Sequence, residues 1–320
     1  MEGSQSRRSC ARLALCALAL MVLPASAEDA FRAATFNLEN YLIAPIGTRP
    51  AKSPESRVAV RNSIGSLNAD IVALQEIGGL AALETLRSDL AAAGHRYPYA
   101  ELAAGHDPHI AVALLSRFPL VARRSHTNES FLLFGKRFHV SRGFLEVDLE
   151  PRPGYRLTVL CAHLKSRRVS PEADESSIRE QEAILLRGKI DRILAANPKA
   201  NLLVMGDLND HKDSKPIRTI LGRGNTAMID TRPTERSSMT GDPRRTLRQP
   251  AWTHFYAKED SYSRVDYILI SRGLYHEWIQ SKSWIPADPD WGLASDHRPV
   301  TALFSTNDRG PGSSPTSLRP

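Results

Sequence analysis

The sequence predicts an α+β fold, a four-layer α/β/β/α sandwich in which two packed mixed β-sheets are covered by helices on their outer faces. Short apolar runs of strand length recur along the chain, which predicts the sheets. Between these runs, apolar residues recur at helical spacing, which predicts the covering helices. No internal repeat and no linker divides the sequence after residue 27, so these elements are expected to form one domain.

Eight apolar runs are predicted to be strands, and each is bounded by helical or loop-forming segments. They cover residues 31–38, 71–74, 110–115, 144–149, 156–163, 202–205, 265–271 and 300–304. Three helices are expected between them. Residues 55–68 repeat apolar side chains on one face and end at Asn68, which can cap a helix. Residues 177–196 carry a broad apolar stripe that stops before a proline, and residues 80–93 form the third helix.

The first 27 residues have the pattern of a signal peptide. Three arginines precede an apolar run at 13–23, and Ala25-Ser26-Ala27 has the small-x-small form of a cleavage site. The apolar run is too short to span a bilayer comfortably, which favours cleavage over a membrane anchor. We therefore expect export to the periplasm or the medium, with the domain at 28–304 and a disordered tail rich in Ser, Pro and Gly at 305–320.

The mature chain keeps one cysteine, Cys161, because Cys10 and Cys16 leave with the leader. No intramolecular disulfide can form, so the hydrophobic core alone must hold the fold. Cys161 belongs to the alternating pattern of the strand at 156–163 and is expected to be a buried, unreactive side chain.

The net charge of +7 is compatible with polyanionic substrates such as nucleic acid or anionic lipid headgroups, without choosing between them. The segment 222–250 is rich in arginine. A solvated loop is the favoured interpretation, and a rim loop that meets a polyanion is the alternative. Its arginines are Arg223, Arg232, Arg236, Arg244, Arg245 and Arg248.

Polar residues stand beside or at the ends of several apolar runs, in six short motifs. These are TFNLEN at 35–40, QEI at 75–77, AHLKS at 162–166, GDLND at 206–210, SRVDYILI at 263–270 and SDHRPV at 295–300. Because a strand scaffold can deliver such side chains to one rim, we expect them to lie together. An Asp–His pair taken alone could equally be a structural hydrogen bond.

In this order the motifs resemble the endonuclease/exonuclease/phosphatase superfamily, which includes pancreatic-type deoxyribonucleases, apurinic endonucleases, neutral sphingomyelinases and inositol polyphosphate 5-phosphatases. The resemblance runs from about Phe31 to Phe304. It is specific for the superfamily and not for a substrate. It implies a metal-dependent phosphoric ester hydrolase.

The resemblance implies a catalytic role for five residues. His297 would act as a base oriented by Asp266, and Asp207 would hold the attacking water. Asn209 would donate to a phosphate oxygen. His163 resembles the second histidine of the deoxyribonuclease and sphingomyelinase branches, and this match makes membership of the apurinic endonuclease branch less favoured. His163 would protonate the leaving group or donate a hydrogen bond to the phosphate. Which histidine is the acid and which the base stays open.

The implied metal residues are Glu76 as the carboxylate ligand, Asn37 beside it, and Asp296, which would contact the ion or position a second one. Hard oxygen donors favour Mg²⁺, with Mn²⁺ or Ca²⁺ as alternatives, over tetrahedral zinc.

Three further residues are weaker candidates. In relatives a carboxylate near Asp107 often steadies the second histidine, and Arg142 and Lys165 would bind phosphate or be surface charges. Arg298 is expected to pack or form an ion pair near the site. The remaining histidines are treated as bystanders: His95, His106, His126, His139, His211, His254 and His276.

The leading functional hypothesis is an exported, Mg²⁺-dependent phosphodiesterase, an endonuclease with a nucleic acid substrate, acting as a monomer without an obligate protein partner. The alternative is a sphingomyelinase-like or phosphoinositide-directed hydrolase. Such enzymes often carry an exposed apolar hairpin, for which Trp284, Trp291 and residues 131–134 are the candidates, although a core strand is favoured for 131–134. A non-catalytic binding module on the same fold is a weaker alternative.

Overall fold

A computed structural model describes residues 30–169, 171–235, 249–288 and 290–307. The predicted leader and most of the predicted tail lie outside these residues. Arg236, Arg244, Arg245 and Arg248 of the arginine-rich segment lie outside them as well.

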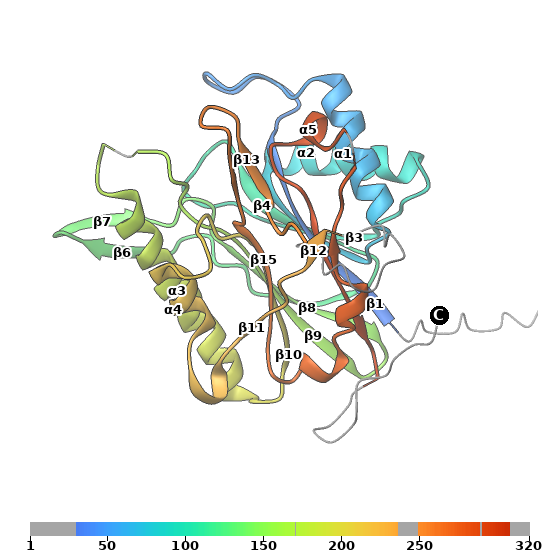
Figure 1. Cartoon of the computed structure of the whole chain (residues 1–320), viewed down its shortest axis with the longest axis vertical. Coiled ribbons are helices and arrows are strands. Elements are labelled where there is room, and N and C mark those ends of the chain that lie inside the picture. The colour runs from blue at the N-terminus through green and yellow to red at the C-terminus, as the bar shows by residue number, and fades with distance from the viewer. Residues whose placement is uncertain (1–29, 170, 236–248, 289, 308–320) are drawn as a thin grey trace, which may run out of the picture.

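Two large mixed sheets form the centre of the molecule (Figure 1). The first sheet has the strand order β12 (Thr234–Glu235), β16 (Trp284–Ile285), β17 (Val300–Ser305), β1 (Ala30–Tyr41), β2 (Ile71–Ile77), β4 (Ala111–Ser116) and β3 (Tyr99–Ala103). The second has the order β11 (Ile229–Asp230), β15 (Asp266–Ile270), β10 (Asn201–Asp207), β9 (Tyr155–His163), β8 (Phe144–Arg152) and β5 (Leu120–Arg123). All eight predicted strands are present, and their observed ends differ from the predicted ends by a few residues.

Helices cover the outer faces of both sheets, as predicted. The first sheet carries α1 (Pro54–Leu67) and α2 (Gly79–Ala92), with the short α5 (Trp291–Ala294) beside α1. The second carries α3 (Glu175–Ala196) and α4 (Lys215–Leu221). Single 3-10 turns lie at Gly224–Thr226, Tyr275–Glu277 and Gln280–Lys282.

Local sequence sets the ends of the two long helices. Ser53 caps α1 by accepting from the Ser56 backbone N–H, and Asn68 ends it in the left-handed conformation, as expected. Asp174 caps α3 by accepting from the Ser177 N–H.

Three apolar clusters separate the four layers. Side chains such as Leu114 and Val159 fill the space between the two sheets. Ile64 and Leu83 pack the first pair of helices onto β2 and β4, and Leu186 and Ile190 pack α3 onto the second sheet. The predicted four-layer sandwich is therefore confirmed. Within the described residues, no helix is long and apolar enough to cross a membrane.

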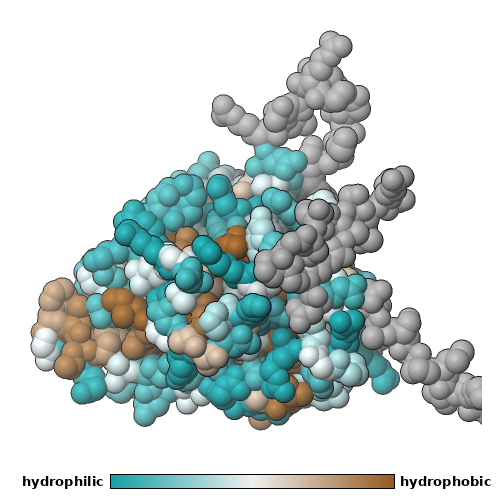
Figure 2. Space-filling model, turned by 90° about the horizontal axis from the view of Figure 1, so that it is seen from below, coloured by the Kyte–Doolittle hydropathy of each residue, from teal (hydrophilic) through white to brown (hydrophobic). Residues whose placement is uncertain are grey.

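A two-stranded hairpin, β6 (Ser130–Leu133) with β7 (Lys136–His139), projects from the second sheet beside α3 (Figure 1). Phe131 packs inward, whereas Leu132 is 65% exposed and Phe134 is 77% exposed. Figure 2 shows an apolar patch at this end of the molecule. The core strand favoured for 131–134 is therefore confirmed only in part: β6 is a strand and Phe131 joins the core, whereas Leu132 and the tip residue Phe134 are exposed.

Gly206 is required by the approach of β9 to β10. It has φ of 142°, and a Cβ placed there would lie 1.9 Å from the Ala162 carbonyl oxygen. Gly206→Ala should therefore lower the free energy of unfolding by about 3 kcal/mol, measured by urea denaturation. Gly188→Ala on α3 is the matched control: its Cβ would meet no atom within 4 Å, so stability should rise by up to about 1 kcal/mol. Equal stability of the two variants would contradict this account.

Candidate active site

The residues predicted from the motifs converge where the carboxyl ends of four strands meet. β1 and β2 run parallel in the first sheet, and β9 and β10 run parallel in the second. Asn37 and Glu76 lie near the ends of β1 and β2, while His163 and Asp207 are the last residues of β9 and β10. Asn37 Nδ2 donates to Asp207 Oδ2 at 3.0 Å, so this bond joins the rims of the two sheets.

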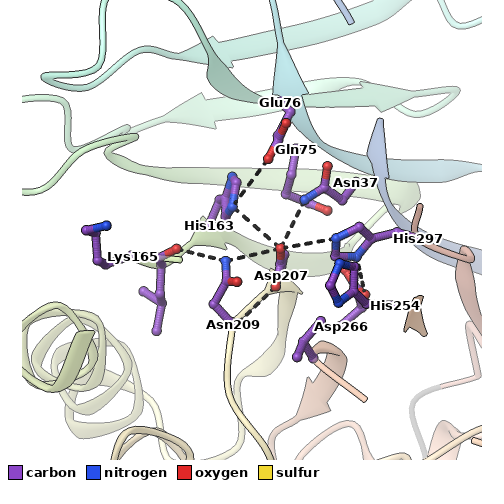
Figure 3. A network of polar contacts seen from close by, with 12 residues as sticks. Asn37, Gln75, Glu76, His163, Lys165, Asp207, Asn209, His254, Asp266 and His297 are labelled. Atoms are coloured by element: carbon purple, nitrogen blue, oxygen red, sulfur yellow. Dashed lines mark hydrogen bonds and ion pairs between the residues drawn. The ribbon is translucent and has the colours of Figure 1, made fainter. Parts of the chain in front are cut away.

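The Asp207 carboxylate is the centre of the cluster (Figure 3). Its Oδ2 lies 3.5 Å from His163 Nε2 and 3.8 Å from His297 Nε2. All three side chains are buried. Two imidazoles therefore face one carboxylate oxygen, which is an arrangement suited to proton transfer on either side of a bound group.

Asp266 orients His297. It is the first residue of β15 and pairs with Asp207 in the strand ladder, which places both carboxylates at the same level. Asp266 Oδ2 lies 2.8 Å from His297 Nδ1, and this contact directs Nε2 toward Asp207. His297 itself is held by its backbone N–H, which donates to Ser295 Oγ.

The two histidines have opposite electrostatic environments. Burial would lower the pKa of His297, but the Asp266, Asp207 and Asp296 carboxylates outweigh it and raise that pKa to about 10. Burial, followed by the charges of Arg142, His297 and Arg49, holds the pKa of His163 well below its ordinary value. His163 is therefore neutral and His297 is protonated at neutral pH, unless positive charge is added nearby.

Burial and the neighbouring Asp266 raise the pKa of Asp207. Asn37 and the backbone N–H of Asn209 oppose this by donating hydrogen bonds to the carboxylate. A carboxyl with a raised pKa that is shared by two imidazoles is typical of a functional site.

Glu76 is held by a strained turn of the first strand. Its Oε2 accepts from the Asn40 backbone N–H at 2.8 Å, and its Oε1 lies 4.0 Å from His163 Nε2. Glu39, Asn40 and Glu76 all have positive φ, of 48°, 53° and 62°. Three left-handed non-glycine residues at one place indicate that the surrounding structure fixes this carboxylate.

Two arginines add positive charge around His163. Arg142 is buried, and its Nε has no hydrogen-bond partner among the described residues. Arg49 donates to Asn40 Oδ1 at 3.1 Å from the loop after β1. Both charges lower the pKa of His163, so both lie near the site. Arg142 was a predicted phosphate ligand, whereas Arg49 follows no apolar run and carried no signal in the sequence.

His254, which was expected to be a bystander, lies beside the candidate site. It lies in β13 (His254–Tyr256), which forms a hairpin with β14 (Ser261–Ser263), and a backbone bridge pairs it with His297. The two rings are 4.5 Å apart, and His254 Nε2 lies 3.6 Å from Asp296 Oδ2. This proximity could not be predicted from the sequence, because 43 residues separate the two bridged histidines.

Four aromatic rings contact one another on and beside the β13–β14 hairpin, and we name them the aromatic cluster: Trp252, Phe255, Tyr262 and Trp291. Trp252 contacts Tyr262 and Trp291 at 4.8 and 5.0 Å between ring centroids, and Phe255 stacks on Tyr262 at 4.6 Å. The Phe255 backbone N–H donates to the Asp296 carbonyl, which ties the cluster to the site. Arg298 stacks on Trp252 and pairs with Glu235, as expected for a packing residue.

The weaker candidates lie at the edge of the cluster. Asn209 Nδ2 already donates to Leu164 O and Asp207 Oδ2. The Lys165 side chain points away from Asp207 (Figure 3), and its Nζ donates to the Arg168 carbonyl. Asp107 caps the backbone N–H groups of His109 and Ile110. It does not steady His163, whose Nδ1 is buried without a hydrogen-bond partner among the described residues.

The donor set fits a hard divalent cation. Asn37, Glu76, Asp207 and Asp296 offer amide and carboxylate oxygens, which Mg²⁺ prefers. Among the described residues, Asp207, Asp266 and His297 bring ligand atoms within 4.8 Å of one another, and so do His254, Asp296 and His297. Glu76 stands outside both groups, and its role as a ligand stays a prediction.

Comparison with solved structures shows the fold. The catalytic domain of human Nocturnin with bound sulfate is 18% identical at a TM-score of 0.61, covering 87% of this chain and 94% of that chain. Sphingomyelinase C from Streptomyces griseocarneus is 20% identical at 0.57, covering 86% and 99%. A double mutant of Staphylococcus aureus beta toxin with bound magnesium ions is 19% identical at 0.56, covering 86% and 99%. No curated protein sequence matches the chain.

The family model for the endonuclease/exonuclease/phosphatase family matches residues 34–297. This range begins just before the Asn37 motif and ends at His297, so it contains nearly every residue that converges on Asp207. The chain therefore belongs to the endonuclease/exonuclease/phosphatase family.

Proposed function

We propose that this protein is an exported, divalent-metal-dependent phosphodiesterase that cleaves nucleic acid internally. The observation that carries the proposal is the arrangement around Asp207. Cations lie on the His163 side, and the β13–β14 hairpin, which is bridged to His297, carries the exposed rings of Tyr256 and Tyr262. A nucleic acid strand presents phosphates and bases in the same alternation, and proteins bind it with cationic grooves and stacking rings.

The chain's own residues suffice to describe the proton steps. A water held at Asp207 Oδ2 would attack the phosphorus, and one of the two facing imidazoles would take its proton. The other imidazole would protonate or hydrogen-bond the leaving oxygen. Arg142 and Arg49 would neutralise the phosphoryl oxygens. A divalent cation held by Glu76 and Asn37 would add charge relief at the same oxygens.

A test of the substrate class compares supercoiled plasmid with lipid vesicles, each with and without Mg²⁺. Nicking of the plasmid that requires Mg²⁺ is the expected result. Hydrolysis of sphingomyelin or phosphoinositide vesicles together with an intact plasmid at low salt would overturn the nuclease proposal and leave the phosphodiesterase chemistry in place.

Arg142→Ala should weaken DNA binding and flatten its salt dependence. Each phosphate contact contributes about −0.9 to the slope of log K against log salt concentration on duplex DNA, so losing one contact should reduce the slope by about that amount. Binding is measured by fluorescence anisotropy in EDTA, which separates it from cleavage. Arg96→Ala, an exposed arginine after α2, is the control and should not change the slope. An unchanged slope in Arg142→Ala would exclude this phosphate contact.

One observation favours a second candidate, a lipid-directed phosphodiesterase. The sequence offered no clear apolar protrusion, but the β6–β7 hairpin exposes Leu132 and Phe134 next to Lys136 and Arg137. Apolar side chains flanked by cations suit contact with an anionic bilayer. The vesicle arm of the substrate test decides between the two candidates.

A further inference from the structure

The β13–β14 hairpin presents different rings on its two faces. Side chains alternate along a strand, so His254 and Tyr256 share one face of β13 and Phe255 lies on the other. Phe255 packs into the aromatic cluster, and its backbone N–H donates to the Asp296 carbonyl. The hairpin is therefore anchored to the protein through the face that carries Phe255.

The other face carries a row of three rings that begins at His297. The His254 ring lies 4.5 Å from the His297 ring, and the Tyr256 ring lies 6.4 Å from His254 at an interplanar angle of 26°. Figure 3 shows His254 beside His297. The His297 side chain is 7% exposed, the His254 side chain is 22% exposed, and Tyr256 is 41% exposed. The row of rings thus leads from the buried cluster at Asp207 to solvent.

Strand β14 does not cover this row of rings. The residues that pair with His254 and Tyr256 across the hairpin are Ser263 and Ser261, whose side chains are small. By contrast, Phe255 pairs with another aromatic residue and stacks on it at 4.6 Å. A flat ligand can therefore approach the row of rings from solvent, whereas the opposite face of the hairpin is filled by the protein's own aromatic side chains.

The chemistry of this face suits a nucleobase next to the scissile phosphate. The row of rings begins at an imidazole that faces Asp207, and the charges of Arg142 and Arg49 lie near the other facing imidazole, His163. A phosphodiester bound between the imidazoles would place a neighbouring base at the row. Every base has a π face and stacks on aromatic side chains. In a duplex the faces of a base are covered by its neighbours, so such stacking requires an unpaired or extruded base.

We propose that Tyr256 and His254 stack an unpaired base next to the scissile phosphate, so that the protein cleaves single-stranded nucleic acid in preference to duplex. This inference rests on the nuclease function proposed above and names its substrate class. Tyr256 determines specificity in this view and takes no part in proton transfer. Duplex is cleaved more slowly, since a base in a duplex must be extruded at the cost of its pairing and stacking.

The experiment compares one oligonucleotide, single-stranded and annealed to its complement, in Mg²⁺. In the wild type, kcat/KM for the single strand should exceed that for the duplex by about tenfold or more, because the duplex must first release a base. Tyr256→Ala should lower kcat/KM for the single strand by about tenfold, the effect of losing one stacked base, and should therefore reduce the ratio. Tyr256→Phe should keep the wild-type ratio, because it keeps the ring.

An abasic strand of the same length gives a measurement that a merely structural role of Tyr256 would not change. Binding is followed by fluorescence anisotropy in EDTA. The wild type should bind the normal strand about tenfold or more tightly than the abasic strand, and Tyr256→Ala should reduce this difference by about tenfold. Tyr275→Ala is the matched control: Tyr275 is 47% exposed and lies in a 3-10 turn outside the hairpin, so the difference should stay at the wild-type value.

Three outcomes would contradict the inference. A wild-type enzyme that cleaves the duplex as fast as the single strand would overturn it whether or not any variant folds, and would leave the nuclease proposal in place. An unchanged ratio in Tyr256→Ala, with folding checked by circular dichroism, would overturn it as well. If the wild type cleaves neither oligonucleotide nor plasmid in Mg²⁺, the proposed nuclease function fails, and this inference fails with it.

Discussion

Replacing His297 by alanine should lower kcat for phosphodiester hydrolysis by about 10³-fold, because a positioned acid or base contributes roughly 10²–10⁴-fold. The His297 ring is buried, faces Asp207 through Nε2 and is fixed by Asp266 through Nδ1. Asp266→Asn should have a similar effect, since an amide neither fixes the same tautomer nor stabilises the imidazolium. The measurement is kcat on a small chromogenic phosphodiester, which avoids effects on binding of a large substrate.

The same pair predicts a pH dependence of stability in the ion-free protein. The pKa of His297 in the folded chain is raised from 6.5 to about 10, so protonation favours the folded state. This contribution is fully present below pH 6.5 and is lost as the pH rises through about 10. Urea denaturation in EDTA should show stability falling across this window in the wild type, and a flatter profile in Asp266→Asn.

His276→Ala is the control for both measurements, because His276 lies in a 3-10 turn outside the Asp207 cluster. It should leave kcat and the pH profile of stability unchanged. A near-normal kcat in Asp266→Asn would show that His297 does not need Asp266 for catalysis. The contact between them would then be only a structural hydrogen bond, the alternative that the sequence left open.

The elements with strong periodicity could be predicted from sequence because burial fixes them. The strands that carry Asn37, Glu76, His163 and Asp207 are apolar on both faces, since each sheet packs against helices on one side and the other sheet on the other. The polar residues near the ends of these apolar strands can therefore be recognised in the sequence as candidate site residues. The helix ending at Asn68 was predictable for a similar reason, because apolar spacing and a left-handed cap agree.

The missed features depend on contacts between distant segments. His254 reaches the site through a bridge to His297, and neither neighbour of His254 marks it as functional. Arg49 lies in a loop whose path is set by hydrogen bonds to β1 rather than by any periodic pattern. The exposed end of the β6–β7 hairpin was not favoured because the apolar run 131–134 alternates between a packed face and an exposed tip, which composition alone does not separate.

Glu76→Ala should lower kcat by about 10³-fold and should make the remaining activity insensitive to Mg²⁺. A divalent ion supplies several kcal/mol of charge stabilisation to a phosphoryl transition state, and each 1.36 kcal/mol corresponds to about tenfold in rate. Chelation of the wild type with EDTA should produce the same loss, and Mg²⁺ or Mn²⁺ should restore it because the donors are oxygens.

The fold should survive Glu76→Ala, because the side chain is 18% exposed and its carboxylate makes one hydrogen bond to a backbone N–H. Thermal denaturation in EDTA should therefore show similar midpoints for the variant and the wild type. Glu84→Ala on α2, whose side chain is 52% exposed, is the matched control and should keep full Mg²⁺-dependent activity. Full wild-type activity in excess EDTA would refute the metal dependence. If Glu76→Ala is inactive but still binds Mn²⁺ with wild-type affinity, the ion is bound by the groups around His297 and not by Glu76.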